Sequence, residues 1–379
     1  MDTTTLDQAP GRELAVDPDE ITQAFEYYDE QGWTDGLPVV PVTESSLAAF
    51  LAATDRDPDD VLFHIPHLNR SMTVRLAAIN AALAGCKPAY LPVVIAAWEA
   101  IAAEPHPRRG IWQSTTGTAP FLVVNGPVRT EIGLNSQGNI YGSGFRANAT
   151  IGRAIRLGCI NVFGLRPHSL DQATQGTPAK YSACIGENEE QSPWAPFHVD
   201  NGFEATDSVV TAFVIRSVMH IEARHTMSPE QLAEDFADSI RRTGALIHEY
   251  TSALLVLVPE HADLFAAAGW SKDDVRQAVF ERVVRPRAEL AAAGKDAVSH
   301  KTRWRLPSGH PDSMPDTAAG SDTPDVVPLM SHPTSVQVMV AGANNAGVSS
   351  VVEVFTLNPP RAIPFSAVKI GAVENGAGA

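Results

Sequence analysis

Residues 133–194 hold glycines, amides, hydroxyls and isolated charges at a density that the apolar segments around them do not match. A segment that only built a core would carry fewer polar groups, because each one buried without a partner costs about 1–3 kcal/mol. Such a stretch is either a solvated loop or the lining of a site. Its first part favours a site, because a glycine-rich loop runs directly into a cationic amphipathic helix, predicted over residues 147–159.

The surrounding segments show the periodicities of helices and strands. Residues 72–103 are alanine-rich, and on a helix their apolar side chains would cover most of the circumference. With a break at Gly85, this pattern predicts two buried helices. Residues 119–124 form a continuous apolar run before an Asn-Gly-Pro turn, which predicts a buried strand. Further strands are predicted over residues 37–41, 161–164, 181–185, 208–221, 253–258, 336–341 and 349–355, and further helices over residues 19–31, 44–54, 228–246, 259–268 and 271–285. This alternation predicts an α/β fold with mixed sheets and packed helices.

A chain of 379 residues is longer than one small hydrophobic core usually stabilises. We therefore expect one large or two intimately packed α/β halves, and no convincing internal repeat is visible in the sequence. The predicted divisions are a mobile acidic tail over residues 1–18, an α/β region over 19–205, a second over 206–370 with a Pro/Gly/Ser-rich loop at 305–328, and a tail over 371–379.

The composition excludes several classes of protein. A net charge of −16 argues against nucleic acid or an anionic membrane as the main partner, since both need clustered cations. No signal-peptide pattern opens the chain, and no apolar run reaches the ~20 residues of a membrane helix. Three separated cysteines without a CxxC pair favour neither a zinc site nor a thioredoxin-type motif. We expect a cytoplasmic protein that forms an oligomer, and the sequence indicates no particular cofactor.

The glycine loop and the helix after it predict an anion site. Gly142 and Gly144 let backbone N–H groups approach a ligand, and the start of a helix favours negative charge. Arg146 and Arg153 share one helix face, with Arg156 three residues further on, and guanidinium groups suit carboxylates or phosphates. The uncharged polar candidates for the same cleft are Asn135, Asn139, Asn148 and Thr116. The alternative is a tight loop with a solvated basic face, and the spacing fits neither a Rossmann nor a Walker motif.

Three residues between the loop and Trp194 are candidates for chemistry. Lys180 enters an apolar segment, and a partly buried lysine near carboxylates can transfer protons. Glu187 is the second candidate for proton transfer, although for any single glutamate of the ENEE sequence a surface acidic loop is the better explanation. Cys184 follows Lys180 by four residues and is either a nucleophilic thiolate beside a cation or an inert buried thiol.

The twelve histidines show no tight metal-binding spacing. His64 and His67 lie three residues apart with a proline between them, and a pair at a strand end explains them better than half a metal site. No metal ligand is therefore assigned.

Five segments carry a family resemblance: GWTDGLPVVP at 32–41, NAALAGCKPAYLPVV at 80–94, GFRANATIGRAIRL at 144–157, GTPAKY at 176–181 and ENEEQSPW at 187–194. They resemble a little-characterised bacterial family associated with UGSC-motif proteins, which carry selenocysteine or cysteine in a GSC context. This chain has no such motif and resembles the large-subunit type. The resemblance implies a small UGSC-type partner subunit that would supply any reactive thiol or selenol.

Together these features predict an enzyme that acts on a small anionic organic molecule. Acid–base cleavage or formation of a carbon–heteroatom bond, as in a lyase, is the expected reaction. Arg146 and Arg153 would bind the anion, Asn148 and the loop amides would orient it, and Lys180 would transfer the proton. The alternative is a non-catalytic or co-catalytic large subunit that works with a small thiol or selenol redox partner, as in a thiol-assisted oxidoreductase.

Overall fold

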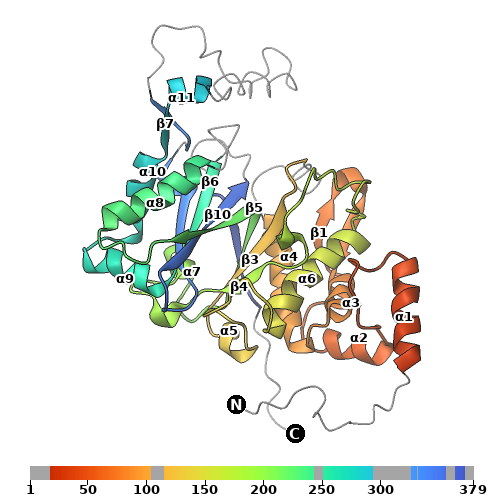
Figure 1. The fold of residues 1–379 in the computed structure, drawn as a ribbon. Coiled ribbons are helices and arrows are strands. Elements are labelled where there is room, and N and C mark those ends of the chain that lie inside the picture. The colour runs from red at the N-terminus through yellow and green to blue at the C-terminus, as the bar shows by residue number, and fades with distance from the viewer. Residues whose placement is uncertain are drawn as a thin grey trace.

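The computed structural model describes residues 18–103, 115–242, 251–292, 326–330, 332–355 and 363–371. The two predicted tails lie almost entirely outside these residues, as does most of the predicted loop over residues 305–328. Figure 1 shows a central sheet with one group of helices on either side. The predicted α/β fold with a mixed sheet is confirmed.

Local signals in the sequence set the ends of the N-terminal helices. These helices are α1 (Pro18–Glu30), α2 (Glu44–Leu51), α3 (Val74–Ala84), α4 (Leu91–Ala103), α5 (Val128–Glu131) and α6 (Arg146–Asn161). The side chain of Thr43 accepts the Ser46 N–H to cap α2, and Thr73 caps α3 in the same way. Helix α3 ends at Gly85, whose φ of 88° suits glycine best.

One seven-stranded sheet is built from strands between residues 119 and 369. Its strands are β3 (Ala119–Asn125), β4 (Cys184–Gly186), β5 (Val209–Glu222), β6 (Thr251–Leu257), β9 (Val336–Val340), β10 (Val348–Phe355) and β11 (Ser366–Lys369). The order is β4-β3-β5-β10-β6-β9, and β11 also pairs with β5. The two predicted α/β regions therefore share a single sheet.

The two halves of this sheet repeat one arrangement that the sequence did not reveal. In the first half β4 is parallel to β3, and β5 is antiparallel to β3. In the second half β9 is parallel to β6, and β10 is antiparallel to β6. Strands β5 and β10 join the halves as an antiparallel pair. The two outermost strands converge at their carboxyl ends, where the Asn188 N–H donates to the Val340 carbonyl oxygen at 2.8 Å.

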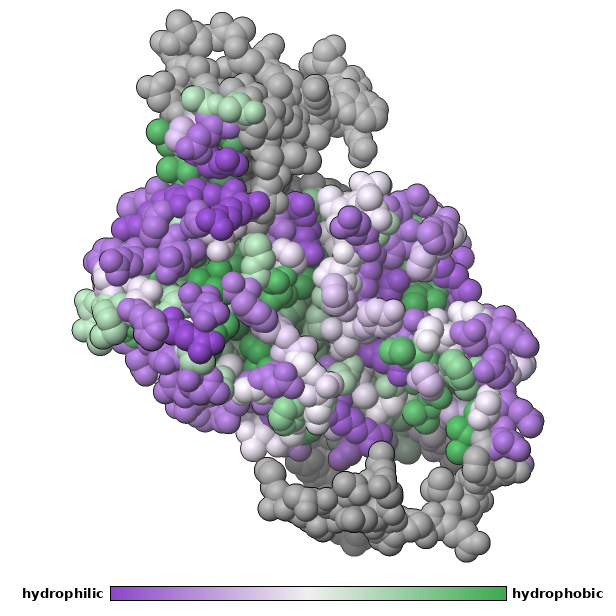
Figure 2. Space-filling view, viewed as in Figure 1, coloured by the Kyte–Doolittle hydropathy of each residue, from purple (hydrophilic) through white to green (hydrophobic). Residues whose placement is uncertain are grey.

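Three clusters of buried side chains pack against this sheet. The residues of β3 alternate between clusters: Leu122 and Val124 pack with α3, α4 and α6, whereas Phe121 and Val123 point to the inner face between the halves. A third cluster joins the second half to α8 (Pro229–Arg242), α9 (Pro259–Ala267) and α10 (Lys272–Arg282). The remaining helices are α7 (Phe197–Asp200), whose Phe197 packs in the inner-face cluster, and α11 (Arg287–Ala292). Figure 2 shows hydrophobic side chains gathered between the two groups of helices.

Several predicted strands differ from the structure. Residues 37–41 form no strand, because Pro38 and Pro41 have no backbone N–H to donate to a neighbouring strand. Residues 161–164 form the end of α6 and a turn, and the strand predicted over residues 181–185 is limited to β4. The hairpin of β1 (Val61–Ile65) and β2 (Arg70–Thr73) was not predicted. The end of the predicted loop over residues 305–328 is a strand, β8 (Val326–Pro328), which pairs with β7 (Val284–Pro286).

Candidate functional site

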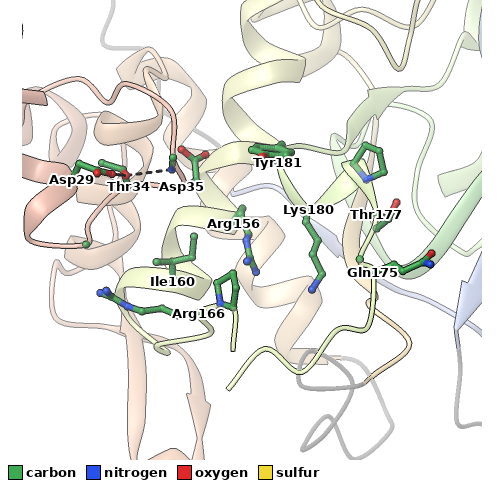
Figure 3. Close-up of a pocket in the computed structure, with 15 residues that line it drawn as sticks. Asp29, Thr34, Asp35, Arg156, Ile160, Arg166, Gln175, Thr177, Lys180 and Tyr181 are labelled. Atoms are coloured by element: carbon green, nitrogen blue, oxygen red, sulfur yellow. Dashed lines mark hydrogen bonds between the residues drawn. The ribbon is translucent and has the colours of Figure 1, made fainter. Parts of the chain in front are cut away.

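The larger of two neighbouring cavities, cavity 1, is lined by the basic side chains of Arg156, Arg166 and Lys180. It has a volume of about 640 Å³ and lies between the loop after α1 and the segment that leads to β4. Figure 3 shows Arg156 and Lys180 pointing the same way from α6 and from that segment. The other polar side chains of its wall are Asp29, Thr34, Asp35, Gln175, Thr177 and Tyr181.

Lys180 is held by a buried carboxylate. Its Nζ lies 2.7 and 2.6 Å from the two carboxylate oxygens of Asp171, and Arg156 reaches the same group at 3.3 Å. Burial alone would raise the pKa of Asp171, but the hydrogen bonds from Lys180 and the Ala173 amide, with the charges of Lys180 and Arg156, hold it below its ordinary value. Asp171 therefore remains a carboxylate and fixes the Lys180 ammonium at the cavity wall.

Arg166 is the basic group of cavity 1 with the most freedom to bind. Among the described residues its guanidinium has no hydrogen-bond acceptor. The group lies directly against Gly32, where a Cβ would collide with it, and Gly32 also has a φ of 68°. The glycine therefore makes room for a cation whose five N–H donors remain available to a ligand.

The two arginines predicted to bind the substrate are engaged elsewhere. Arg153 donates to both oxygens of Asp35 at 2.8 Å and to the carbonyl oxygens of Leu37 and Pro38, so it fixes the loop that forms one wall of cavity 1. Arg146 is exposed and donates to the Gly85 carbonyl oxygen. The structure brings neither guanidinium into the lining of cavity 1.

The predicted polar residues of the glycine loop mostly hold the loop itself. Asn148 accepts the Asn135 N–H and donates to the carbonyl oxygens of Asn135 and Cys184. The side chain of Asn135 bonds to Gln137 and Gly138, and that of Asn139 donates to Ser143. Thr116 and Gly144 are exposed, and neither lines cavity 1.

A second cavity, cavity 2, is lined by three of the predicted residues. It has a volume of about 590 Å³, and Gly142, Asn148 and Cys184 contribute to its wall. Residues 176–178 line both cavities and so lie between them. The predicted site is therefore divided, with Lys180 in cavity 1 and the start of α6 in cavity 2.

The thiol of Cys184 is not poised as a nucleophile. The residue is 4% exposed, and burial raises the pKa of its thiol above the ordinary value. Lys180 points instead to Asp171. Cys86 and Cys159 are also buried. The structure favours the alternative of an inert buried thiol at each position.

Glu187 belongs to a buried polar cluster on the inner face of the sheet. Its carboxylate accepts from Asn125 at 2.5 Å and from the Phe197 N–H at 2.7 Å, and Lys272 lies 4.0 Å away. Neighbouring Glu189 and Glu190 pair with buried Arg129. Glu187 and Glu189 therefore lie in a largely buried ion network, whereas Glu190 is exposed at its edge. Glu187 lines neither cavity 1 nor cavity 2.

The Glu187→Gln variant is expected to gain stability relative to the wild type as the pH rises above 4.5, the ordinary value of the carboxyl. Burial raises the folded-state pKa of Glu187, although Lys272, the Phe197 N–H and Asn125 oppose this. The unfolded chain therefore releases its proton first, and the wild type loses stability until the pH passes the folded-state pKa. Urea unfolding of both proteins across a pH series measures the difference.

Glu190→Gln is the matched control for that experiment. The hydrogen bond from Arg129 lowers the pKa of Glu190, so this carboxylate stabilises the fold above its unfolded pKa and stops doing so as the pH falls. The variant should therefore lose stability relative to the wild type with rising pH. The same slope in both variants would contradict the assignment for Glu187.

The described part of the chain contains no group of three or more His, Cys, Asp or Glu side chains that could hold a metal ion. His64 bonds to Ser71 across the β1–β2 hairpin, so it serves the fold. Within the described residues, no helix has the length and apolar character needed to cross a membrane.

Several residues of the cavities escaped the sequence analysis, among them Arg166, Tyr141, Arg216 and His220. Arg166 follows α6 in a loop with no local pattern, and His220 lies on the outer part of the long strand β5. Only the folded chain brings Arg166 beside Lys180.

No family model, no curated protein and no solved structure matches this chain.

Proposed function

We propose that this chain is an enzyme that binds a small organic anion in cavity 1. The observation that carries the proposal is the presence of Arg156, Arg166 and Lys180 in the wall of one cavity, in a chain of net charge −16. Of the two acids in the lining, Asp35 is neutralised by Arg153. A carboxylate or phosphate would meet guanidinium donors that are otherwise unused.

Lys180 is the proposed proton donor and acceptor. The cleavage or formation of a carbon–heteroatom bond remains the reaction that we propose. In the cleavage direction the heteroatom keeps the electron pair of the broken bond and takes a proton from the Lys180 ammonium. The electron pair of a neighbouring C–H bond forms the new C=C bond, and the proton of that C–H bond passes to solvent water. In the reverse direction water returns the proton to carbon and Lys180 takes back the proton of the heteroatom. Asp171 orients the ammonium, and Arg166 holds the anionic part of the substrate.

Arg166→Gln tests the anion site. The chain would be incubated with a panel of small carboxylates and phosphates, and their consumption followed by mass spectrometry. For the substrate found, the variant is expected to raise KM about tenfold with little change in kcat, because a charge-assisted hydrogen bond is lost. Arg166 is exposed, so the fold should tolerate the change.

Arg146→Gln is the matched control, because Arg146 is also an exposed arginine but does not line cavity 1. Its KM should equal that of the wild type. Equal losses in both variants would show a general effect of charge, and wild-type kinetics in Arg166→Gln would refute the site. Failure of the chain to consume any anion of the panel would count against the proposal.

A further inference from the structure

Cavity 2 differs from cavity 1 in its chemistry. Its floor is the inner face of the sheet, where Phe121, Ile185 and Ile215 point into the space. Tyr141 and His220 lie at its edge and are partly exposed to solvent, so a molecule can reach it. A largely apolar chamber of about 590 Å³ with a few polar groups has the size and character of a small-molecule site.

Its aromatic edge is fixed in place. The Tyr141 ring centroid lies 6.3 Å from that of Phe121 and 6.2 Å from that of His220. The hydroxyls of Tyr141 and of Ser350 on β10 form a hydrogen bond of 2.8 Å, in which either can be the donor. Both halves of the sheet therefore position this ring. The imidazole of His220 has no hydrogen-bond partner among the described residues. Such an edge suits the face of a flat ring.

The ionisable groups of the lining favour an anion. No aspartate or glutamate is among the described residues that line cavity 2, although the chain has 44 acids against 28 bases. Arg216 lines the cavity and uses one nitrogen, Nη1, to contact Glu353 at 3.2 Å. Glu353 is in turn held by Ser217. The other guanidinium donors of Arg216 remain for a ligand carboxylate.

We propose that cavity 2 is a second ligand site, specific for a small aromatic carboxylate. The ring lies against Tyr141 and His220 on the apolar floor, and the carboxylate is bound by Arg216. The start of α6 lines the same cavity and adds a favourable partial positive charge. This site does not depend on the chemistry proposed for cavity 1, because the two cavities share only residues 176–178.

Calorimetric titration of the full chain with three probes tests this site. Benzoate carries both features, benzamide lacks the charge, and cyclohexanecarboxylate lacks the aromatic ring. Benzoate is expected to bind about tenfold more tightly than benzamide, as the loss of a charge-assisted contact predicts. It should also bind more tightly than cyclohexanecarboxylate, and His220→Ala should reduce that second preference.

Two variants place the binding in cavity 2. Val218→Phe fills the cavity and should abolish benzoate binding. If Val218→Phe does not fold, the double variant Arg216→Gln/Glu353→Gln replaces it in the test. This double variant removes the cation without leaving a buried unpaired carboxylate. It should bind benzoate and benzamide equally well. Arg146→Gln, at an exposed arginine that lines neither cavity, should bind benzoate as the wild type does.

Equal affinity of the wild type for benzoate and benzamide would overturn the proposal, as would the absence of saturable benzoate binding. So would benzoate binding that Arg166→Gln weakens and that the cavity 2 variants leave intact, because the carboxylate would then bind in cavity 1. The proposal for cavity 1 would survive the first two results, so the two proposals fail separately.

Discussion

Replacement of Arg129 by methionine is expected to lower the free energy of unfolding by about 3–5 kcal/mol, the usual result of removing one partner from a buried ion pair. Arg129 is 5% exposed and contacts Glu189 at 3.0 Å and Glu190 at 2.9 Å. It also donates to the carbonyl oxygens of Glu187 and Gly126. Methionine keeps much of the volume, so the loss would come from carboxylates and carbonyls left without their donor.

Urea unfolding monitored by far-ultraviolet circular dichroism measures this loss. Arg146→Met is the matched control, because Arg146 is exposed and its side chain has one hydrogen-bond partner among the described residues, the Gly85 carbonyl oxygen. This variant should change the free energy of unfolding by less than about 1 kcal/mol. If both variants lost the same small amount, the ENEE segment would not depend on Arg129 as described.

Lys180→Arg is expected to lower kcat by about 10²–10⁴-fold, the usual contribution of a positioned acid–base group. Arginine keeps the positive charge and can pair with Asp171, but its guanidinium does not release a proton near neutral pH. The variant therefore separates proton transfer from charge. Its melting temperature should stay near that of the wild type, because the buried Asp171 keeps a cation.

Steady-state kinetics on the substrate found for the wild type measures this effect. Arg156→Lys is the control, because it also exchanges one cation for another beside Asp171 but is not assigned a proton transfer; it should keep most of kcat. Wild-type kcat in Lys180→Arg would show that Lys180 only anchors the anion, and the acid–base role would be withdrawn.

Much of the fold could be predicted from local patterns. The caps at Thr43 and Ser271 and the stop at Gly85 mark helix ends through contacts within a few residues, which the sequence shows directly. The apolar runs of β3, β6 and β9 mark buried strands for the same reason. The repeat of the two halves could not be predicted, because it depends on which strands pair and in which direction.

The candidate site was predicted only in part, because long-range contacts decide what each charge does. Arg153 seemed available for a ligand, yet it pairs with Asp35, which lies 118 residues earlier. Glu187 could not be recognised as buried from the acidic ENEE sequence, since Arg129 and Lys272 come from distant parts of the chain. Lys180 lies in a 3-10 turn ahead of β4 and lines cavity 1, and its catalytic role stays a prediction.

The repeated strand arrangement gives the molecule the symmetry of a two-fold dimer joined into one polypeptide. Strands β5 and β10 occupy equivalent places and pair antiparallel, as equivalent strands do across a dyad in a homodimer. A solitary half would leave that strand edge unpaired and prone to association.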